Sequence, residues 1–126
     1  MQLLKEQQIP VILCSSKTKA EMIGYQKIMS IDEYPFIVEN GSAIYTKKHY
    51  FDLNAPINSE ENFDCYHLGK SYSDIVEILK KISRKYNKPI YGFHNTSKDE
   101  IIKRTLLDEE AVDMAMKREF SIPLFY

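Results

Sequence analysis

A strand-like apolar run followed directly by a helix start constrains the fold more than any other feature of this chain. Residues 9–14 (Ile-Pro-Val-Ile-Leu-Cys) form a short, continuous apolar segment, which is typical of a central strand of a parallel sheet, buried on both faces. Thr18 and Glu21 then form a capping box, in which each side chain bonds the other residue's backbone N–H. The box predicts a helix over 19–29. The core-facing residues of this helix are expected to be Met22, Ile23 and Met29.

The next segment predicts two more strands joined by a tight turn. Residues 35–38 (Pro-Phe-Ile-Val) are a second short apolar run, and the residues from Ala43 to about Lys47 form a third. Between them, Asn40-Gly41 is a strong turn signal, because both residue types tolerate positive φ. With a helical tail over residues 2–8, the order of elements is that of an α/β fold.

The second half of the chain predicts a small α+β unit. Strands are expected at about 64–68, 90–93 and 120–126, and helices start after Ser71, Ser97 and Asp108. We therefore predict a partial Rossmann-like core over 1–50, a linker over 51–63 and a smaller α+β unit over 64–126. The helix after Ser71 has one continuous apolar face, formed by Tyr72, Ile75, Val76, Leu79, Ile82 and Tyr86.

Charge and composition exclude several classes of function. The net charge is −1 and the basic residues are dispersed, so no nucleic-acid partner is expected. No run of about 18 apolar residues occurs, and the N-terminal residues turn polar too soon for a signal peptide. Cys14 and Cys65 lack metal-ligand spacing and are expected to be reduced, as in a cytoplasmic protein. No membrane partner is expected either.

The most informative candidate site is the tetrapeptide Ser15-Ser16-Lys17-Thr18. It lies where a predicted strand ends and a helix begins, which is where open α/β sheets bind ligands. Free N–H groups at a helix start attract anions, and two hydroxyls with one ammonium group suit a phosphate. The alternative is ordinary capping by Thr18 beside a solvent-facing lysine, and the local pattern leaves both interpretations open.

Two further segments could border the same site. Glu39-Asn40-Gly41 follows the next strand, where Asn40 could contact substrate hydroxyls, although a simple turn is the more frequent role. Arg118 follows the last helix and could fork onto a carboxylate or phosphate, although a surface ion pair is more common there. The three histidines, His49, His67 and His94, are far apart and have no companions at metal-ligand spacing, so no metal site is predicted.

Three separated motifs resemble a known enzyme family. Leu-Cys-Ser-Ser-Lys-Thr (13–18), Phe-Ile-Val-Glu-Asn-Gly-Ser-Ala-Ile (36–44) and Ala-Met-Lys-Arg-Glu-Phe (115–120) are similar, in order and spacing, to segments of mannosyl-3-phosphoglycerate phosphatases. Those enzymes belong to the haloacid dehalogenase superfamily, in the branch with an inserted α/β cap. The resemblance covers nearly the whole chain and implies that 1–50 belongs to the core and residues from about 64 onward to the cap.

The resemblance also implies roles for individual residues. Ser15 resembles the Ser or Thr of the superfamily's second motif, which hydrogen-bonds the transferring phosphoryl group, and Lys17 stands at the place of a following basic residue. Asn40 and Gly41 match an Asn-Gly pair at the border of the active-site cleft. Arg118 matches a cap arginine that would hold the phosphoglycerate end of the substrate. Ser16, Thr18 and Glu39, which neighbour these motif residues, complete the predicted substrate contacts.

The chain departs from the family pattern in the residues that perform the chemistry. Family members carry an Asp-x-Asp strand, whose aspartates act as nucleophile and acid–base, and further carboxylates that bind Mg²⁺; no Asp-x-Asp occurs here. We therefore expect no turnover by these 126 residues alone and no tight Mg²⁺ binding. The neighbouring strand of residues 9–14 is expected to be missing, which would leave an edge that pairs with another copy or with a complementing chain.

Other functions remain open from sequence. The chain could be a free-standing, non-catalytic module that binds a phosphorylated sugar or sugar acid, or a relict without function. A related phosphatase of the same branch, acting on glucosyl-3-phosphoglycerate or sucrose phosphate, would fit the same residues.

Overall fold

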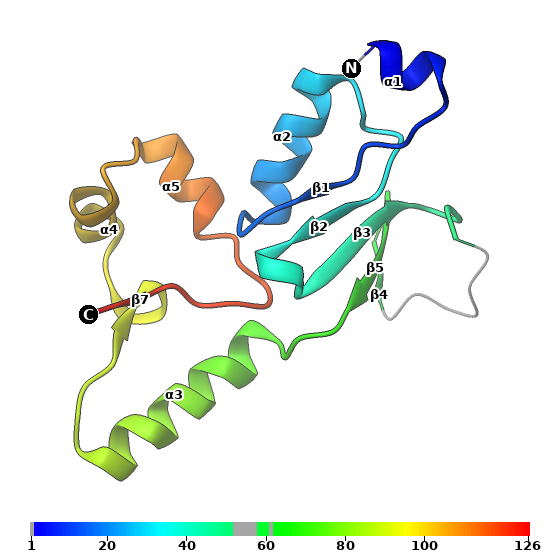
Figure 1. Cartoon of the computed structure of the whole chain (residues 1–126). Coiled ribbons are helices and arrows are strands. Elements are labelled where there is room, and N and C mark those ends of the chain that lie inside the picture. The colour runs from blue at the N-terminus through cyan, green and yellow to red at the C-terminus, as the bar shows by residue number, and fades with distance from the viewer. Residues whose placement is uncertain (1, 52–57, 61) are drawn as a thin grey trace.

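The computed structural model describes residues 2–51, 58–60 and 62–126, and its centre is a mixed five-stranded sheet (Figure 1). The strand order is β1-β2-β3-β5-β4. β1 pairs with β2 in parallel, and every other pairing in this sheet is antiparallel. This confirms an α/β fold whose sheet contains a parallel pair. The strands are β1 (Leu13–Cys14), β2 (Phe36–Val38), β3 (Ala43–Lys47), β4 (Asn58–Ser59) and β5 (Phe63–His67).

The hydrophobic core lies on one face of this sheet. Phe36, Val38 and Tyr45 are fully buried on that face, where the rings of Phe36 and Tyr45 stack at 5.6 Å between centroids. Phe63 packs edge-on against both rings. Because side chains alternate along a strand, the intervening residues point to the opposite face, and the large apolar ones among them are only partly buried. These partly buried residues are Ile37, Ile44 and Tyr66.

Helix α2 (Lys19–Met29) covers the core face and begins where the sequence predicts. The capping box is present, with Thr18 and Glu21 bonding each other's backbone, and Ser30 ends the helix in the left-handed conformation. Met22 is buried, but the expectation that Met29 faces the core is wrong, because it lies 36% exposed in the last turn.

The expectation that residues 9–14 form a strand buried on both faces is also wrong. Only Leu13 and Cys14 are in β1, which is an edge strand with β2 as its single neighbour among the described residues. Ile9 and Ile12 are 44% and 42% exposed. The apolar composition of residues 9–14 is typical of a central strand. In the described part of the structure, however, only one face of β1 is covered and only one of its edges is paired.

The remaining helices start at the predicted caps. The side chains of Ser71, Ser97 and Asp108 each accept the N–H three residues further on, as N-caps do. Two short strands, β6 and β7, pair antiparallel in a separate sheet. These elements are α1 (Gln2–Glu6), α3 (Tyr72–Tyr86), β6 (Tyr91–Gly92), α4 (Lys98–Thr105), α5 (Glu109–Ala115) and β7 (Leu124–Phe125).

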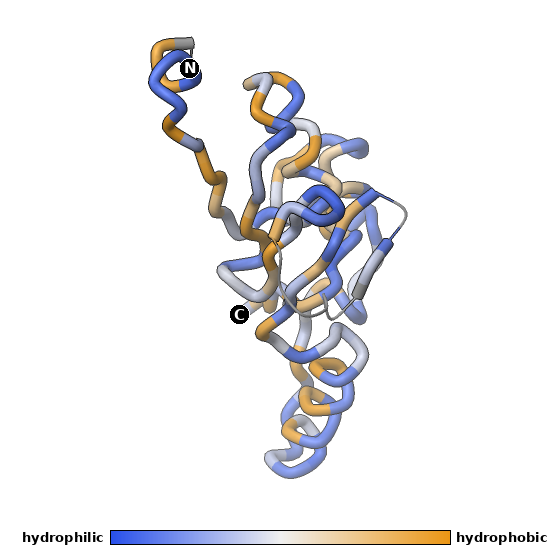
Figure 2. The backbone as a smooth tube through the Cα atoms, turned by 90° about the vertical axis from the view of Figure 1, so that its right-hand side faces the viewer, coloured by the Kyte–Doolittle hydropathy of each residue, from blue (hydrophilic) through white to orange (hydrophobic). Residues whose placement is uncertain are grey.

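Helix α3 extends away from the main sheet, and none of its residues is fully buried (Figures 1 and 2). Orange and blue residues alternate along it in Figure 2, as the amphipathic pattern predicts. Ile78 and Ile82 are 39% and 41% exposed. In the part of the chain that the structure describes, no helix has the length and apolar character needed to cross a membrane.

The two predicted units are joined more closely than the linker at 51–63 suggests. β5, which the sequence assigns to the second unit, pairs with all five residues of β3. Residues 52–57 and 61 of that linker lie outside the described residues. The division into a core and a second unit stays a prediction, and the pairing shows that Phe63–His67 belongs to the main sheet.

Replacing Phe36 tests where the stability of the fold resides. Phe36→Ala removes a fully buried ring that contacts Tyr45 and Phe63, so we expect the free energy of unfolding to fall by about 3–5 kcal/mol. Urea denaturation measures the change. Ile28→Ala, at an 81% exposed position on α2, is the control and should change stability by less than about 0.5 kcal/mol. Equal effects of the two substitutions would contradict this core assignment.

Candidate active site

The loops after β1 and β2 lie side by side at one edge of the sheet. The N–H of Ser15 donates to the carbonyl of Ile37 at 3.1 Å, and the N–H of Asn40 donates to the carbonyl of Ser15 at 3.1 Å. The N–H of Glu39 donates to the carbonyl of Lys17 at 3.0 Å. Parallel pairing of β1 and β2 brings their carboxyl ends together, so the structure joins the predicted site loops as the sequence indicates.

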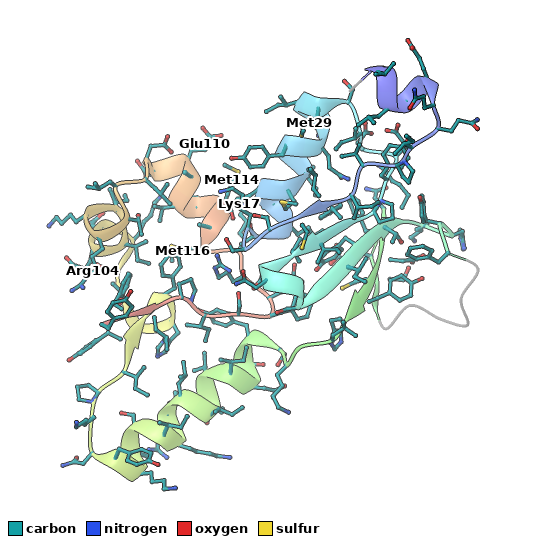
Figure 3. All side chains as sticks on the ribbon, viewed as in Figure 1. Lys17, Met29, Arg104, Glu110, Met114 and Met116 are labelled. Atoms are coloured by element: carbon teal, nitrogen blue, oxygen red, sulfur yellow. The ribbon has the colours of Figure 1, made fainter. Side chains whose placement is uncertain are left out.

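In the first loop, Ser15 and Lys17 remain accessible to a ligand. The Ser15 hydroxyl accepts the N–H of Lys17 at 3.3 Å, which leaves its own proton available for donation. The Lys17 ammonium lies 3.5 Å from a carboxylate oxygen of Glu21 and 5.6 Å from the ring centroid of Tyr25. Its side chain is 40% exposed and lies near the end of α5 (Figure 3). A loosely paired cation next to a free hydroxyl is suited to an anion.

Thr18 occupies a different environment. It is fully buried, its hydroxyl accepts the N–H of Glu21, and the hydroxyl lies 2.9 Å from the carbonyl of Met114 in α5. The Thr18 N–H donates to the Glu21 carboxylate at 2.8 Å. These contacts are those of a helix cap that also fastens α5 to α2. Thr18 thus stabilises the loop by capping α2, and its direct contact with substrate stays a prediction.

Glu39 is a buried carboxylate whose oxygens are already bonded by the protein. Its side chain is 1% exposed. One oxygen accepts the N–H of Glu119 at 2.9 Å, and the other accepts the N–H of Phe120 at 3.1 Å and the hydroxyl of Ser121 at 2.6 Å. A carboxylate with these donors holds the segment 119–121 against the turn. In this conformation Glu39 offers no free oxygen to a ligand.

Arg118 connects this segment to the first loop across 102 residues of sequence. Its Nη2 donates to the carbonyl of Ser16 at 3.1 Å, and its Nη1 donates to the hydroxyl of Ser121 at 2.7 Å. Nη1 also lies 3.8 Å from a Glu39 carboxylate oxygen. The buried Nε has no partner among the described residues. The structure therefore places Arg118 beside the first loop and the Glu39 carboxylate.

The turn at 39–41 has the backbone that its sequence predicts. Asn40 and Gly41 have φ of 61° and 89°, in the left-handed region that Asn and Gly tolerate. Glu39 also has a positive φ of 49°, which the sequence did not indicate. The Asn40 side chain is exposed at the edge of the site, where it is available to a ligand.

One group that sequence reasoning missed, the Tyr45 hydroxyl, fixes the Glu119 side chain. The Tyr45 hydroxyl donates to the Glu119 carboxylate at 3.0 Å from within the core. Burial raises the pKa of Tyr45 far above its usual value, so this hydroxyl keeps its proton and remains a donor. Burial also raises the pKa of the neighbouring Cys65 thiol. A Tyr in a strand and a Glu 74 residues away give no local signal of this contact.

An open cavity of about 280 Å³ lies between β1 and α2, beside the first loop. Ser15 and Lys17 are its polar members, and the rest of its lining is largely apolar. Figure 3 labels Lys17, just before the start of α2, and Met29, in the last turn of that helix. The cavity lies next to the uncovered edge of β1. Its other lining residues are Leu13, Cys14, Met22, Tyr25 and Met29.

The carboxylates near the loops do not fit a Mg²⁺ site. Mg²⁺ binds through free carboxylate oxygens, substrate phosphates and water. Both oxygens of the buried Glu39 carboxylate accept hydrogen bonds from the protein, and Glu21 caps α2 and pairs with Lys17. Among the described residues, no three His, Cys, Asp or Glu side chains gather as a metal site requires. We derive no metal-dependent step from these residues.

The geometry defines a class of protein: an α/β protein with an anion-suited loop at the carboxyl ends of two parallel strands. No protein-family model matches the chain. The chain is 40% identical, over 97% of its length, to the mannosyl-3-phosphoglycerate phosphatase of Pyrococcus horikoshii. It is 34% identical, over 97% of its length, to the enzyme of the same name from Pyrococcus furiosus.

A third relative, from a different organism, is similar to the chain over almost the same length. The chain is 35% identical, over 95% of its length, to the glucosyl-3-phosphoglycerate/mannosyl-3-phosphoglycerate phosphatase of Persephonella marina. Along nearly its whole length the chain is therefore similar to one part of mannosyl-3-phosphoglycerate phosphatases. It spans about half the length of the curated relatives it matches, 44–49% of each.

Glu39→Gln tests the link between the turn and segment 119–121. An amide retains one acceptor but sets an NH₂ group against backbone donors, so we expect unfolding free energy to fall by about 2–3 kcal/mol. Thermal or urea denaturation gives the value. The control is Glu33→Gln, which neutralises an exposed carboxylate paired with Lys5 and should leave stability unchanged within error. A Glu39→Gln variant as stable as the parent would show that the buried carboxylate is dispensable.

Proposed function

We propose that this chain supplies the phosphate-binding loop and part of the cap of a phosphatase that hydrolyses mannosyl-3-phosphoglycerate to mannosylglycerate and phosphate. The observation that carries the proposal is the hydrogen bond from Arg118 to the carbonyl of Ser16. This bond joins two of the three motifs that resemble segments of the phosphatases. Identity of 34–40% to enzymes of that name supports the assignment. The haloacid dehalogenase core with an α/β cap, and a cytoplasmic location, are parts of the same proposal.

The proposed roles follow from which atoms are free. The Ser15 hydroxyl donates to a phosphate oxygen, and the Lys17 ammonium supplies positive charge beside it. The fixed guanidinium of Arg118 supplies positive charge beside the acidic end of the substrate. Asn40 borders the site from the second loop. Glu39 holds Arg118 and segment 119–121 in place, and Thr18 holds the helix.

The proposal does not restrict the sugar of the substrate to mannose. The Persephonella marina relative is named for both glucosyl- and mannosyl-3-phosphoglycerate, so relatives at comparable identity differ in the sugar they are named for. The phosphoglycerate part is common to both names. A binding role without catalysis is the second candidate, because the two carboxylates nearest the loop, Glu21 and Glu39, are bonded to protein groups.

Lys17→Gln tests phosphate binding at the first loop. Loss of one charge-assisted contact of about 1.5 kcal/mol weakens binding of inorganic phosphate or mannosyl-3-phosphoglycerate by about tenfold, measured by calorimetry. Lys27→Gln, which removes an exposed lysine in the last turn of α2, is the matched control and should bind like the parent. Equal affinity of the Lys17 and Lys27 variants would refute the assignment of the loop.

An activity assay on the same purified chain tests whether it can bind the substrate without hydrolysing it. We expect no Mg²⁺-dependent release of phosphate by these 126 residues, because they contain no Asp-x-Asp to supply the nucleophile and acid–base. A colorimetric phosphate assay, with the Pyrococcus horikoshii enzyme as positive control, measures it. Turnover that persists through repeated purification would overturn this expectation.

The free edge of β1 is the proposed binding surface for a further polypeptide. β1 pairs only with β2 among the described strands, and unpaired backbone groups at a sheet edge bind an added strand. The exposed Ile12 and the apolar cavity beside Leu13 and Met22 provide cover for its side chains. We propose that the occupant corresponds to the half of the relatives that this chain does not match.

Co-expression tests this surface. The chain should co-purify with the unmatched part of the Pyrococcus horikoshii enzyme, and Ile12→Lys should weaken that association, because it places a charge where apolar cover is needed. Ile28→Lys, on the exposed side of α2, is the control. Sedimentation that shows self-association instead, or no association at all, counts against the proposed occupant.

A further inference from the structure

A second cavity, of about 220 Å³, lies between the C-terminal half of α3 and the residues that come before and after β6. It shares no lining residue with the site at the first loop. Its volume is below the range of about 300–1,000 Å³ for drug-sized ligand sites, so it suits a small ligand. The lining comprises Leu79, Lys80, Ser83, Arg84, Pro89, Ile90, His94 and Asn95.

The charged residues that line this cavity have one sign. Lys80 and Arg84 are cationic, His94 is an imidazole, and no lining residue is acidic. Glu77 bonds the Lys80 ammonium at 2.8 Å, but this pair is exposed and Glu77 does not line the cavity. Exposed pairs of this kind contribute little, so Lys80 can exchange Glu77 for another anion at small cost. The hydrogen bonds and ion pairs of the described residues leave the Arg84 guanidinium without an acceptor.

His94 responds to the same charges. Its Nδ1 is buried and has no partner in the described part of the chain. Burial lowers the pKa of His94, and the positive charge of Lys80 lowers it further. Both causes oppose a positive imidazole. An anion in the cavity would offset the positive charge of Lys80 and favour the protonated His94 imidazole.

The other polar groups of the lining hold its walls in place. The Ser83 hydroxyl donates to the carbonyl of Lys88 at 2.7 Å, which fixes the end of α3. The Asn95 side chain donates to the carbonyl of Ile90 at 2.9 Å and accepts the N–H of Gly92 at 3.0 Å. The walls are therefore fixed by bonds that do not use Arg84, Lys80 or His94.

We infer that this cavity is a binding site for a small phosphate-bearing anion, held by Arg84, Lys80 and His94, with Leu79, Pro89 and Ile90 against its apolar part. The planar guanidinium of Arg84 matches two phosphate oxygens, and the Lys80 ammonium adds a point charge. A free phosphate and a phosphate monoester share this chemistry. The site is independent of the proposed phosphatase function.

Titration of the ¹⁵N-labelled chain, with inorganic phosphate in one arm and glycerol phosphate in the other, tests the site by NMR. We expect saturable shifts at residues 79–84 and 94–95 in at least one arm, and tighter binding in the second arm if the natural ligand is an ester. Arg84→Gln should weaken this binding about tenfold. Lys85→Gln, the adjacent exposed lysine, is the matched control, and Lys17→Gln should leave these shifts unchanged.

A second readout uses the His94 ring. A bound anion favours the charged imidazole, so the His94 pKa should rise when phosphate is present. If Arg84→Gln does not fold, Lys80→Gln with Lys81→Gln as its control replaces it. The inference is overturned if neither arm produces saturable shifts, if Arg84→Gln binds like Lys85→Gln, or if the His94 pKa is unchanged at saturating phosphate.

Discussion

The buried carboxylate of Glu39 is the interaction on which the rest of the site depends. It accepts the N–H groups of Glu119 and Phe120 and the hydroxyl of Ser121, and it lies 3.8 Å from Arg118. An ionised carboxylate this deep in a protein is stable only when donors replace the water that it loses. Those donors come from the distant end of the chain, so burying Glu39 and docking segment 119–121 are one event.

That single contact determines how the two loops meet. Segment 119–121 brings Arg118 to the carbonyl of Ser16, while the backbone of Glu39 donates to Lys17. The loop after β1 is therefore held from two directions by groups that converge on Glu39. This geometry gives the motifs at 13–18, 36–44 and 115–120 a common physical reason to occur together in one chain.

Sequence patterns predicted helix caps and turns well, because these features depend on residues close together in the chain. The capping box at Thr18 and Glu21, and the positive φ of Asn40 and Gly41, follow from side-chain chemistry within four residues, and the structure confirms them. The burial of residues 9–14 was predicted wrongly, because their composition does not reveal whether other elements cover both faces of the strand. The role of Glu39 was missed for a similar reason: its partners are about 80 residues away.

The charge balance of the site shows what a ligand must do to bind. Lys17 and Arg118 bring positive charge to the first loop, but Glu21 and Glu39 lie 3.5 Å and 3.8 Å from them, so the four groups sum to zero. An anion must therefore draw Lys17 away from Glu21, which costs little because that lysine is 40% exposed. It cannot do the same to Arg118, whose side chain is 11% exposed and bonded to Ser16 and Ser121. Lys17 is thus the movable cation of the site and Arg118 the fixed one, so substitution of Lys17 should change affinity while substitution of Arg118 should change the fold as well.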